Sequence, residues 1–195
     1  DNGAIVLTAS QPFTSALIMS NIKMFRYEWI WDKKKASNFI FGNKQPMKVH
    51  ENICIFYSRQ PIYNSQKTNA INFYQTNINL KNKQNDNSLQ THNFKELTKM
   101  NINKTDYGKS YEPNKKLAES IIHISKICRP FHPTQKPIAL FEYLIRTYTN
   151  EGDLVLDNCA GSGTTGIACR NLNRNFILIE KEPKFIEIIN KRIKI

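Results

Sequence analysis

Two short apolar runs near the end of the chain each finish in an acidic residue. The run at 154–156 precedes Asp157, and the run at 176–179 precedes Glu180. Short continuous apolar runs are typical of strands that are buried on both faces of a parallel sheet. Between the two runs lie a glycine-rich turn and the start of a helix. The pattern therefore predicts a strand, a turn, a helix and a neighbouring parallel strand, with an acid at the end of each strand.

The same patterning predicts further elements. Short runs rich in β-branched and aromatic residues, bounded by polar segments at 32–36 and 58–61, predict strands. A helix is predicted to begin at Pro137, because proline is favoured in the first helical turn and apolar side chains recur at helical spacing after it. The predicted strands are 4–8, 27–31 and 52–57, and the core face of the helix is Leu140, Tyr143, Leu144 and Thr147.

The turn after the first acid predicts a nucleotide-type cofactor. Gly161 and Gly163 allow unusual backbone angles and close approach to a ligand, and Gly166 allows close packing of helix on strand. The spacing matches an NAD-type glycine motif, but Asp157 closes the strand four residues before the first glycine. Acids at the ends of both strands fit S-adenosylmethionine, which carries a sulfonium, an ammonium and a ribose. The alternative is that Asp157 and Glu180 only cap the helices that follow.

A second motif, His-Pro-Thr-Gln-Lys-Pro, occupies 132–137, where two prolines fix the backbone around polar side chains. Taken alone, His132 fits a hydrogen-bonded structural histidine better than a catalyst. This stretch, the Asp-x-x-x-Gly-x-Gly-Thr-Thr turn and the Glu180 strand, in that order, resemble the β class of amino-methylating DNA methyltransferases. The resemblance implies methyl transfer from S-adenosylmethionine to adenine N6 or cytosine N4.

The resemblance covers about 4–58 and 129–193. Residues 5–13 resemble the strand and active-site loop that follow the catalytic motif of the family, and 27–31 with 52–57 resemble its antiparallel strand pair. The implied fold class is α/β: a Rossmann-like S-adenosylmethionine-dependent methyltransferase sheet with an antiparallel strand pair and an inserted target-recognition region. The implied domains are 1–58 and 128–195 for the methyltransferase parts, with the recognition insert at 59–127.

One family motif is absent. The catalytic Asp/Asn-Pro-Pro-Tyr/Phe-type tetrapeptide does not occur in the 195 residues, so no catalytic residue is assigned, and the motif is expected upstream of Asp1. The chain is then expected to be a fragment, inactive alone, that lacks the central strand between the strands at 154–157 and 4–8. Unpaired backbone groups inside a core are costly. We therefore expect the chain to be unstable, or to close the gap in a way that differs from the family.

The resemblance also implies the cofactor site and the mechanism. An adenine is flipped out of the duplex and the sulfonium methyl is attacked in line. The residues at 11–13 and those of the His132 motif, and their order, resemble adenine enzymes, which favours adenine over cytosine. Lys136 is expected to pair with the cofactor carboxylate. The implied cofactor-binding residues are Asp157, Gly161, Gly163, Thr164 and Glu180, with His132, Thr134 and Lys136 closing over the cofactor.

The charge balance predicts a polyanionic partner. The chain carries 28 Lys and Arg against 16 Asp and Glu, a net charge of +12, which suits salt-dependent contacts with phosphates. Lys33, Lys34 and Lys35 are predicted to contact double-stranded DNA, although the alternative is a solvated basic surface. A homodimer of the full-length protein is compatible with the resemblance.

The middle of the chain has a biased composition. Between Asn64 and Lys104, 21 of 41 residues are Asn, Gln or Lys, which fits a flexible insert, a genomic base bias or groups that read base edges. The aromatic residues of this region suggest that part of it packs. They are Phe73, Tyr74, Phe94, Tyr107 and Tyr111.

Composition limits the remaining classes. No run of about 18 apolar residues occurs, so no transmembrane helix and no membrane partner are expected. The four cysteines lack C-x-x-C spacing, which favours free thiols in a cytoplasmic protein over a metal site. Three functions remain: a fragment of an active methyltransferase from a phage or restriction-modification system, a catalytically dead cofactor- or DNA-binding remnant, and an NAD-dependent oxidoreductase. The third leaves the His132 motif and the basic charge unexplained.

Overall fold

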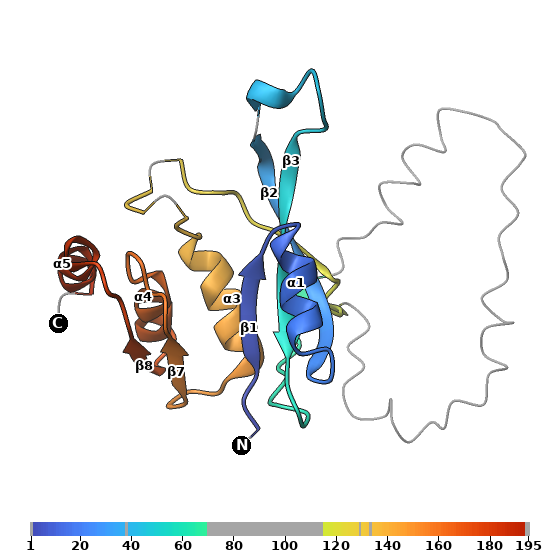
Figure 1. The fold of residues 1–195 in the computed structure, drawn as a ribbon. Coiled ribbons are helices and arrows are strands. Elements are labelled where there is room, and N and C mark those ends of the chain that lie inside the picture. The colour runs from blue at the N-terminus through green and yellow to red at the C-terminus, as the bar shows by residue number, and fades with distance from the viewer. Residues whose placement is uncertain (1, 38, 70–114, 129, 133, 194–195) are drawn as a thin grey trace, which may run out of the picture. The chain divides into compact units, whose positions relative to one another are not determined.

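The computed structural model describes residues 2–37, 39–69, 115–128, 130–132 and 134–193 (Figure 1). The chain divides into two compact units, 1–66 with 119–195, and 67–118. In the smaller unit, β4 (Thr68–Asn69) pairs antiparallel with β5 (Lys115–Lys116). The aromatic residues predicted to pack between 73 and 111 lie outside the described residues. The two predicted methyltransferase parts, 1–58 and 128–195, both belong to the larger unit. The elements described next are those of the larger unit.

A four-stranded sheet contains the amino-terminal strands. The predicted antiparallel pair is confirmed, since Trp29 lies opposite Ile53. A short parallel strand at 121–123, inside the predicted insert 59–127, completes the sheet beside Trp31 and was not predicted. Helix α1 (Phe13–Ser20) follows the first strand, and the 3-10 turn η1 (Phe39–Phe41) lies in the hairpin. Across the sheet the order is β1 (Ile5–Ala9), β3 (Lys48–Phe56), β2 (Phe25–Ser37) and β6 (Ile121–His123).

A separate two-stranded parallel sheet carries the glycine-rich turn (Figure 1). The predicted strand, turn, helix and parallel strand are all present. The second strand ends at Leu178 rather than Glu180, although the Ile179 amide still donates to the Asp157 carbonyl at 2.8 Å. The elements are β7 (Leu154–Asp157), α4 (Thr164–Asn171), β8 (Asn175–Leu178) and α5 (Pro183–Arg192).

Strands β1 and β7 belong to different sheets, and no strand ladder joins them among the described residues. The expected instability of the chain, or its closure of the gap in a way that differs from the family, stays a prediction. Leu154 and Leu156 on β7 are each 61% exposed, and Ile5 on β1 is also exposed. The strand expected between β1 and β7 remains a prediction.

Helix α3 (Ile138–Tyr148) packs against both sheets. Its predicted core face is confirmed, with Leu140, Leu144 and Thr147 buried. The indole Nε1 of Trp29 on β2 donates to the Tyr148 hydroxyl at 2.7 Å. Burial raises the pKa of Tyr148 above its ordinary value, so its hydroxyl stays protonated through neutral pH. The helix therefore connects the four-stranded sheet to α4, on which it also packs.

Gly166 allows close packing behind the glycine-rich turn because it has no side chain. A Cβ built on Gly166 would lie 2.5 Å from Ile193 Cδ1 and 2.8 Å from Leu178 Cδ1. This confirms the predicted close contact of α4 with the strand beside it. All four cysteines are free. Among the described residues, none of the helices has the length and apolar character needed to cross a membrane.

Candidate functional site

The turn between β7 and α4 is shaped by its glycines and by Asp157. Gly161 and Gly163 have φ angles of +54° and +76°, in the left-handed region that favours glycine. One carboxylate oxygen of Asp157 accepts the Cys159 amide at 3.0 Å, and the other accepts the Thr165 hydroxyl. The acid at the end of β7 is thus fixed in orientation at the base of the turn.

Glu180 reaches the same turn from the end of β8. Its Oε2 accepts the Gly161 amide at 2.8 Å, while Oε1 accepts the amides of Lys181 and Glu182 at 2.8 and 3.0 Å. These amides, that of Glu182 first, hold the pKa of Glu180 below its ordinary value, with desolvation opposing them. The carboxylate therefore remains charged beside the turn.

Both interpretations of the two acids find support in this geometry. Asp157 bonds the first turn of α4 through Thr165, and Glu180 accepts amides immediately before α5, so each acid has a local structural role. The two acids also flank one glycine-rich turn, as the cofactor interpretation requires. Since a carboxylate oxygen can accept more than one hydrogen bond, these contacts leave acceptor capacity for a ligand.

Thr164 provides a test of whether the turn fits a cofactor. The residue is 6% exposed, and its Oγ1 is buried with no hydrogen-bond partner among the described residues. A buried hydroxyl without a partner is unfavourable, and a polar group of a bound molecule would satisfy it. The side of each glycine that lacks a Cβ faces protein, namely the His132 ring at Gly161 and Ile189 at Gly163. The buried Thr164 hydroxyl, without a partner among the described residues, is therefore the feature of the turn that fits a cofactor with polar groups.

His132 lies beside the turn. A Cβ built on Gly161 would lie 3.5 Å from the His132 ring, and the ring makes an edge contact with Phe185 at 4.2 Å between centroids. Its Nδ1 accepts the Thr134 amide at 3.2 Å and lies 3.0 Å from the Thr134 hydroxyl. His132 therefore has the structural hydrogen bonds predicted for it as a single residue. The ring also lies against Gly161, and its predicted closure over the cofactor stays a prediction.

Three contributors to the turn were missed by the sequence analysis. Arg192, near the end of α5, donates to the Ser162 hydroxyl at 2.9 Å and also to the Ser162 carbonyl. Burial lowers the pKa of this guanidinium. Thr165 anchors Asp157 and Phe185 contacts His132. Thr165 could have been found from the sequence, because it lies beside Thr164 in the glycine-rich turn. The contacts of Arg192 and Phe185 join residues far apart in the sequence and leave no local pattern.

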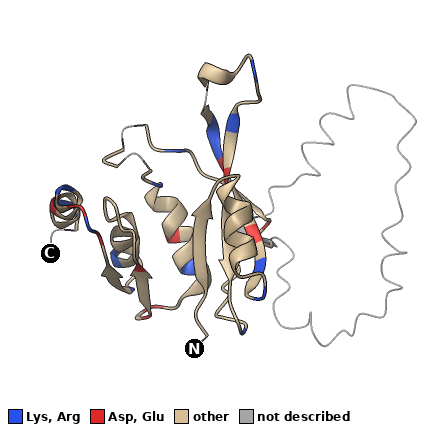
Figure 2. Cartoon of the chain, viewed as in Figure 1, with Lys and Arg blue, Asp and Glu red and all other residues tan. Residues whose placement is uncertain are grey.

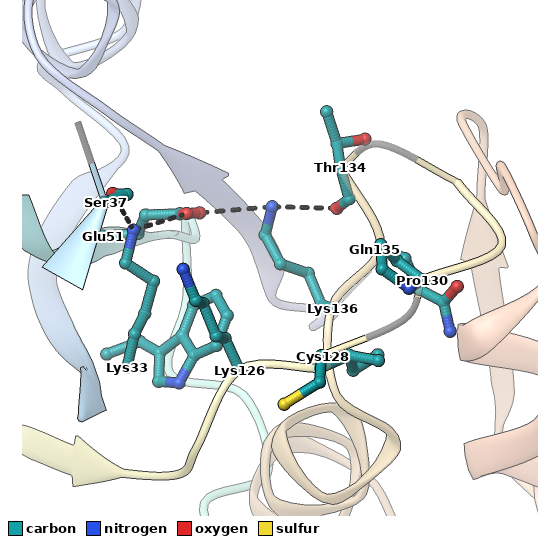
Figure 3. A pocket seen from close by; sticks show the side chains of 11 residues that line it. Lys33, Ser37, Glu51, Lys126, Cys128, Pro130, Thr134, Gln135 and Lys136 are labelled. Carbon is teal, nitrogen blue, oxygen red and sulfur yellow. Dashed lines mark hydrogen bonds and ion pairs between the residues drawn. The ribbon is translucent and has the colours of Figure 1, made fainter. Parts of the chain in front are cut away.

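The ammonium group of Lys136 contacts Glu51 on β3 rather than the glycine-rich turn. The ammonium lies 3.2 Å from Glu51 Oε2 and donates to the Thr134 carbonyl at 3.1 Å, so the side chain points toward β3 (Figure 3). The expected pairing with a cofactor carboxylate is untested and stays a prediction.

The three predicted DNA-contacting lysines also differ from one another. Lys33 is 6% exposed and contacts Glu51, whereas Lys34 and Lys35 are exposed. The two-residue period of a strand places Lys33 on the same buried face as Trp29 and Trp31, and Lys34 on the opposite face. The period is interrupted before Lys35, because Lys34 has a φ angle of +55° and the register of β2 against β3 shifts between Asp32 and Ser37. Figure 2 shows Lys and Arg on both strands of the ribbon formed by β2 and β3. Lys34 and Lys35 are available at that surface.

Comparison with known proteins finds a family model that matches nearly the whole chain and curated relatives that match about a third of it. The DNA methylase family model, of N6 and N4 methyltransferases, matches residues 1–191. The type II methyltransferase M.HpaI of Haemophilus parainfluenzae is 45% identical over 74 residues, which are 38% of this chain and 24% of that protein. The type II methyltransferase M2.DpnII of Streptococcus pneumoniae is 48% identical over 63 residues, 32% of this chain and 24% of that protein. The matched segments thus span about a quarter of these relatives.

Solved structures share the fold. The complex of M1.HpyAVI with S-adenosylmethionine superposes with a TM-score of 0.61 at 24% identity, covering 100% of this chain and 76% of that one. The PvuII cytosine-N4-specific DNA methyltransferase gives a TM-score of 0.61 at 16% identity, covering 98% of this chain and 64% of that one. The chain therefore has the α/β methyltransferase-like fold of these two structures.

Proposed function

Because the chain belongs to the DNA methylase family of N6 and N4 methyltransferases, we propose that it is the S-adenosylmethionine-binding part of a site-specific DNA adenine-N6 methyltransferase of a restriction-modification system. The observation that carries the proposal is the convergence of Asp157 and Glu180 on one glycine-rich turn. A carboxylate at the end of each of two parallel strands suits a ligand that carries both cations and a ribose.

The residues of the turn have separate roles in this proposal. Glu180 accepts ribose hydroxyls while it keeps the Gly161 amide in place, and Asp157 offsets positive charge on the cofactor. The Thr164 hydroxyl, buried without a partner among the described residues, donates to the ligand. His132 and Thr134 close the side of the turn.

When bound, S-adenosylmethionine supplies an electrophilic methyl group on its sulfonium. The contribution of this chain is to hold and orient the cofactor, and orientation of the reacting groups accounts for a large part of the rate of such transfers. The tetrapeptide that would hold the target amine does not occur in the sequence. The chain alone is therefore proposed to bind the cofactor without methylating DNA.

The choice of adenine rests on the sequence motifs. The fold likeness does not favour adenine, because one of the matched structures, the PvuII enzyme, is specific for cytosine N4. Sequencing the complete reading frame and identifying the methylated base in DNA treated with the complete protein would decide it. N6-methyladenine supports the proposal, and N4-methylcytosine replaces it with the alternative specificity.

The cofactor proposal is tested by calorimetric titration of the chain with S-adenosylmethionine, run beside NAD. Saturable binding of the methyl donor, lost in Asp157→Ala and kept in the control Glu151→Ala, supports it. Glu151 suits a control because it is exposed in the turn before β7. Binding of NAD alone would favour an oxidoreductase. Binding of the methyl donor by a complete protein that never methylates DNA would favour the catalytically dead remnant.

A further inference from the structure

A cavity of about 560 Å³ lies on the far side of the His132 motif from the glycine-rich turn. Its walls come from β2, β3, the segment that follows β6, and the segment 134–136 (Figure 3). Its charged lining consists of three lysines and one glutamate: Lys33, Lys126, Lys136 and Glu51. The cofactor site described above uses none of these side chains except Lys136, whose predicted role there is untested.

The charges of the cavity are arranged around Glu51. Lys33 Nζ lies 3.5 Å from Glu51 Oε1, and Lys136 Nζ lies 3.2 Å from Glu51 Oε2. Lys33 also donates to the Ser37 hydroxyl at 3.2 Å, and its side chain is only 8% exposed. A lysine buried to this degree normally requires a partner. One glutamate shared by two ammonium groups leaves the cavity with excess positive charge.

Lys126 adds the third cation. It donates to the Ala36 carbonyl at 3.3 Å, and neither carboxylate oxygen of Glu51 is within ion-pair distance of it in the described chain. An ammonium has three N–H groups, so the hydrogen bonds of Lys33, Lys126 and Lys136 within the described chain leave each of them a donor. Within the described chain, each of the three ammonium groups thus keeps at least one N–H for a negatively charged group.

We propose that this lysine pocket binds a backbone phosphate of DNA. The inference rests on the proposed function, since it requires a DNA substrate. A phosphodiester carries one negative charge and several acceptor oxygens, which match several ammonium donors. The surroundings favour a polyanion, because the chain contains four other lysines and no acidic residue between Lys33 and His50 (Figure 2).

The test measures DNA binding by the whole chain as a function of salt. Each phosphate contact contributes about 0.9 to the slope of log affinity against log salt concentration. Fluorescence anisotropy with a duplex of mixed sequence is therefore measured for the unaltered chain and for Lys126→Gln. We expect the variant to weaken DNA binding and to lower the slope by up to about 0.9, the contribution of one phosphate contact, with unchanged affinity for S-adenosylmethionine by calorimetry. The matched control is Lys191→Gln on α5, an exposed lysine outside the pocket.

A second variant changes the charge in the opposite direction. Glu51→Gln removes the only acid among the described lining residues, so we expect tighter DNA binding with a steeper salt dependence. Equal slopes for Lys126→Gln and the unaltered chain overturn the pocket proposal and leave the proposed function intact. If Lys126→Gln loses affinity for S-adenosylmethionine while the salt dependence of DNA binding is unchanged, the pocket binds the cofactor carboxylate. That result also overturns the proposal of phosphate binding. Absence of DNA binding by the unaltered chain overturns both the pocket and the DNA substrate.

Discussion

The amide of Gly161 donates to the carboxylate of Glu180 at 2.8 Å, which links the turn after β7 to the end of β8. This bond and those from Lys181 and Glu182 favour the charged form of the carboxylate. The pKa of Glu180 is accordingly held below its ordinary value, chiefly by the Glu182 amide. The stability of the turn thus depends on the protonation state of one partly exposed side chain.

A pH dependence follows from this bond. A group with a depressed pKa in the folded state stabilises the fold above its unfolded pKa, about 4.3 for Glu, and the contribution is lost as the pH falls through the folded pKa. Urea unfolding of the chain and of Glu180→Gln should therefore differ at neutral pH and converge in acid, below about pH 4. The control Glu187→Gln, an exposed glutamate on α5, should show no such convergence. A difference independent of pH would contradict the assignment.

Thr164→Val should have opposite effects on stability and on cofactor binding. Its buried Oγ1 has no partner among the described residues, so removal of the hydroxyl should raise the free energy of unfolding by about 1 kcal/mol. The same change should weaken binding of S-adenosylmethionine if the hydroxyl donates to the cofactor. Chemical denaturation and calorimetry measure the two effects, and Thr164→Ser, which keeps the hydroxyl, is the control. Weaker binding in Thr164→Ser as well would point to packing rather than to the hydroxyl.

Gly166→Ala should destabilise the contact between α4 and α5. The new Cβ would lie 2.5 Å from Ile193 Cδ1 and 2.8 Å from Leu178 Cδ1, too close to be accepted without movement. Overpacking of this kind costs about 1–3 kcal/mol, and the low end is expected because both contacts are terminal methyl groups. The thermal unfolding midpoint should fall, whereas the control Gly3→Ala, with nothing within 4 Å of its Cβ, should leave it unchanged. Equal midpoints for the two variants would show that the packing adapts freely.

Tyr148→Phe should loosen the attachment of α3 to the four-stranded sheet. The hydroxyl accepts the indole N–H of Trp29 at 2.7 Å in a buried environment. Its removal leaves a buried donor unpaired, at a cost of about 1–3 kcal/mol in the free energy of unfolding. Urea unfolding followed by tryptophan fluorescence measures the loss. Tyr63→Phe is the control, because the Tyr63 hydroxyl has no hydrogen-bond partner among the described residues, and a similar loss in that variant would refute the explanation.

The sequence predicted those parts of the fold that local pattern determines. The apolar runs ending in Asp157 and Glu180, the glycine-rich turn, and the core face of α3 are confirmed as elements. In each case the spacing of apolar residues or the residue type can be recognised within a few positions of the sequence. The resemblance to the family indicated the order in which these elements follow one another.

Features that depend on distant contacts could not be predicted. The pairing of β6 with β2 joins residues about 90 positions apart, and Arg192 reaches Ser162 from the last helix. The run of lysines on β2 was interpreted by composition as one basic cluster. Strand alternation instead buries Lys33 and exposes Lys34, because successive side chains point to opposite faces.

The segment from His132 to Lys136 contacts the glycine-rich turn with its first residue and Glu51 in the lysine pocket with its last. A ligand that binds on one side of this segment and restrains it reduces the conformational entropy that a ligand on the other side must remove when it binds. The two affinities are then thermodynamically coupled. By reciprocity, whatever factor the first ligand applies to the second, the second applies equally to the first.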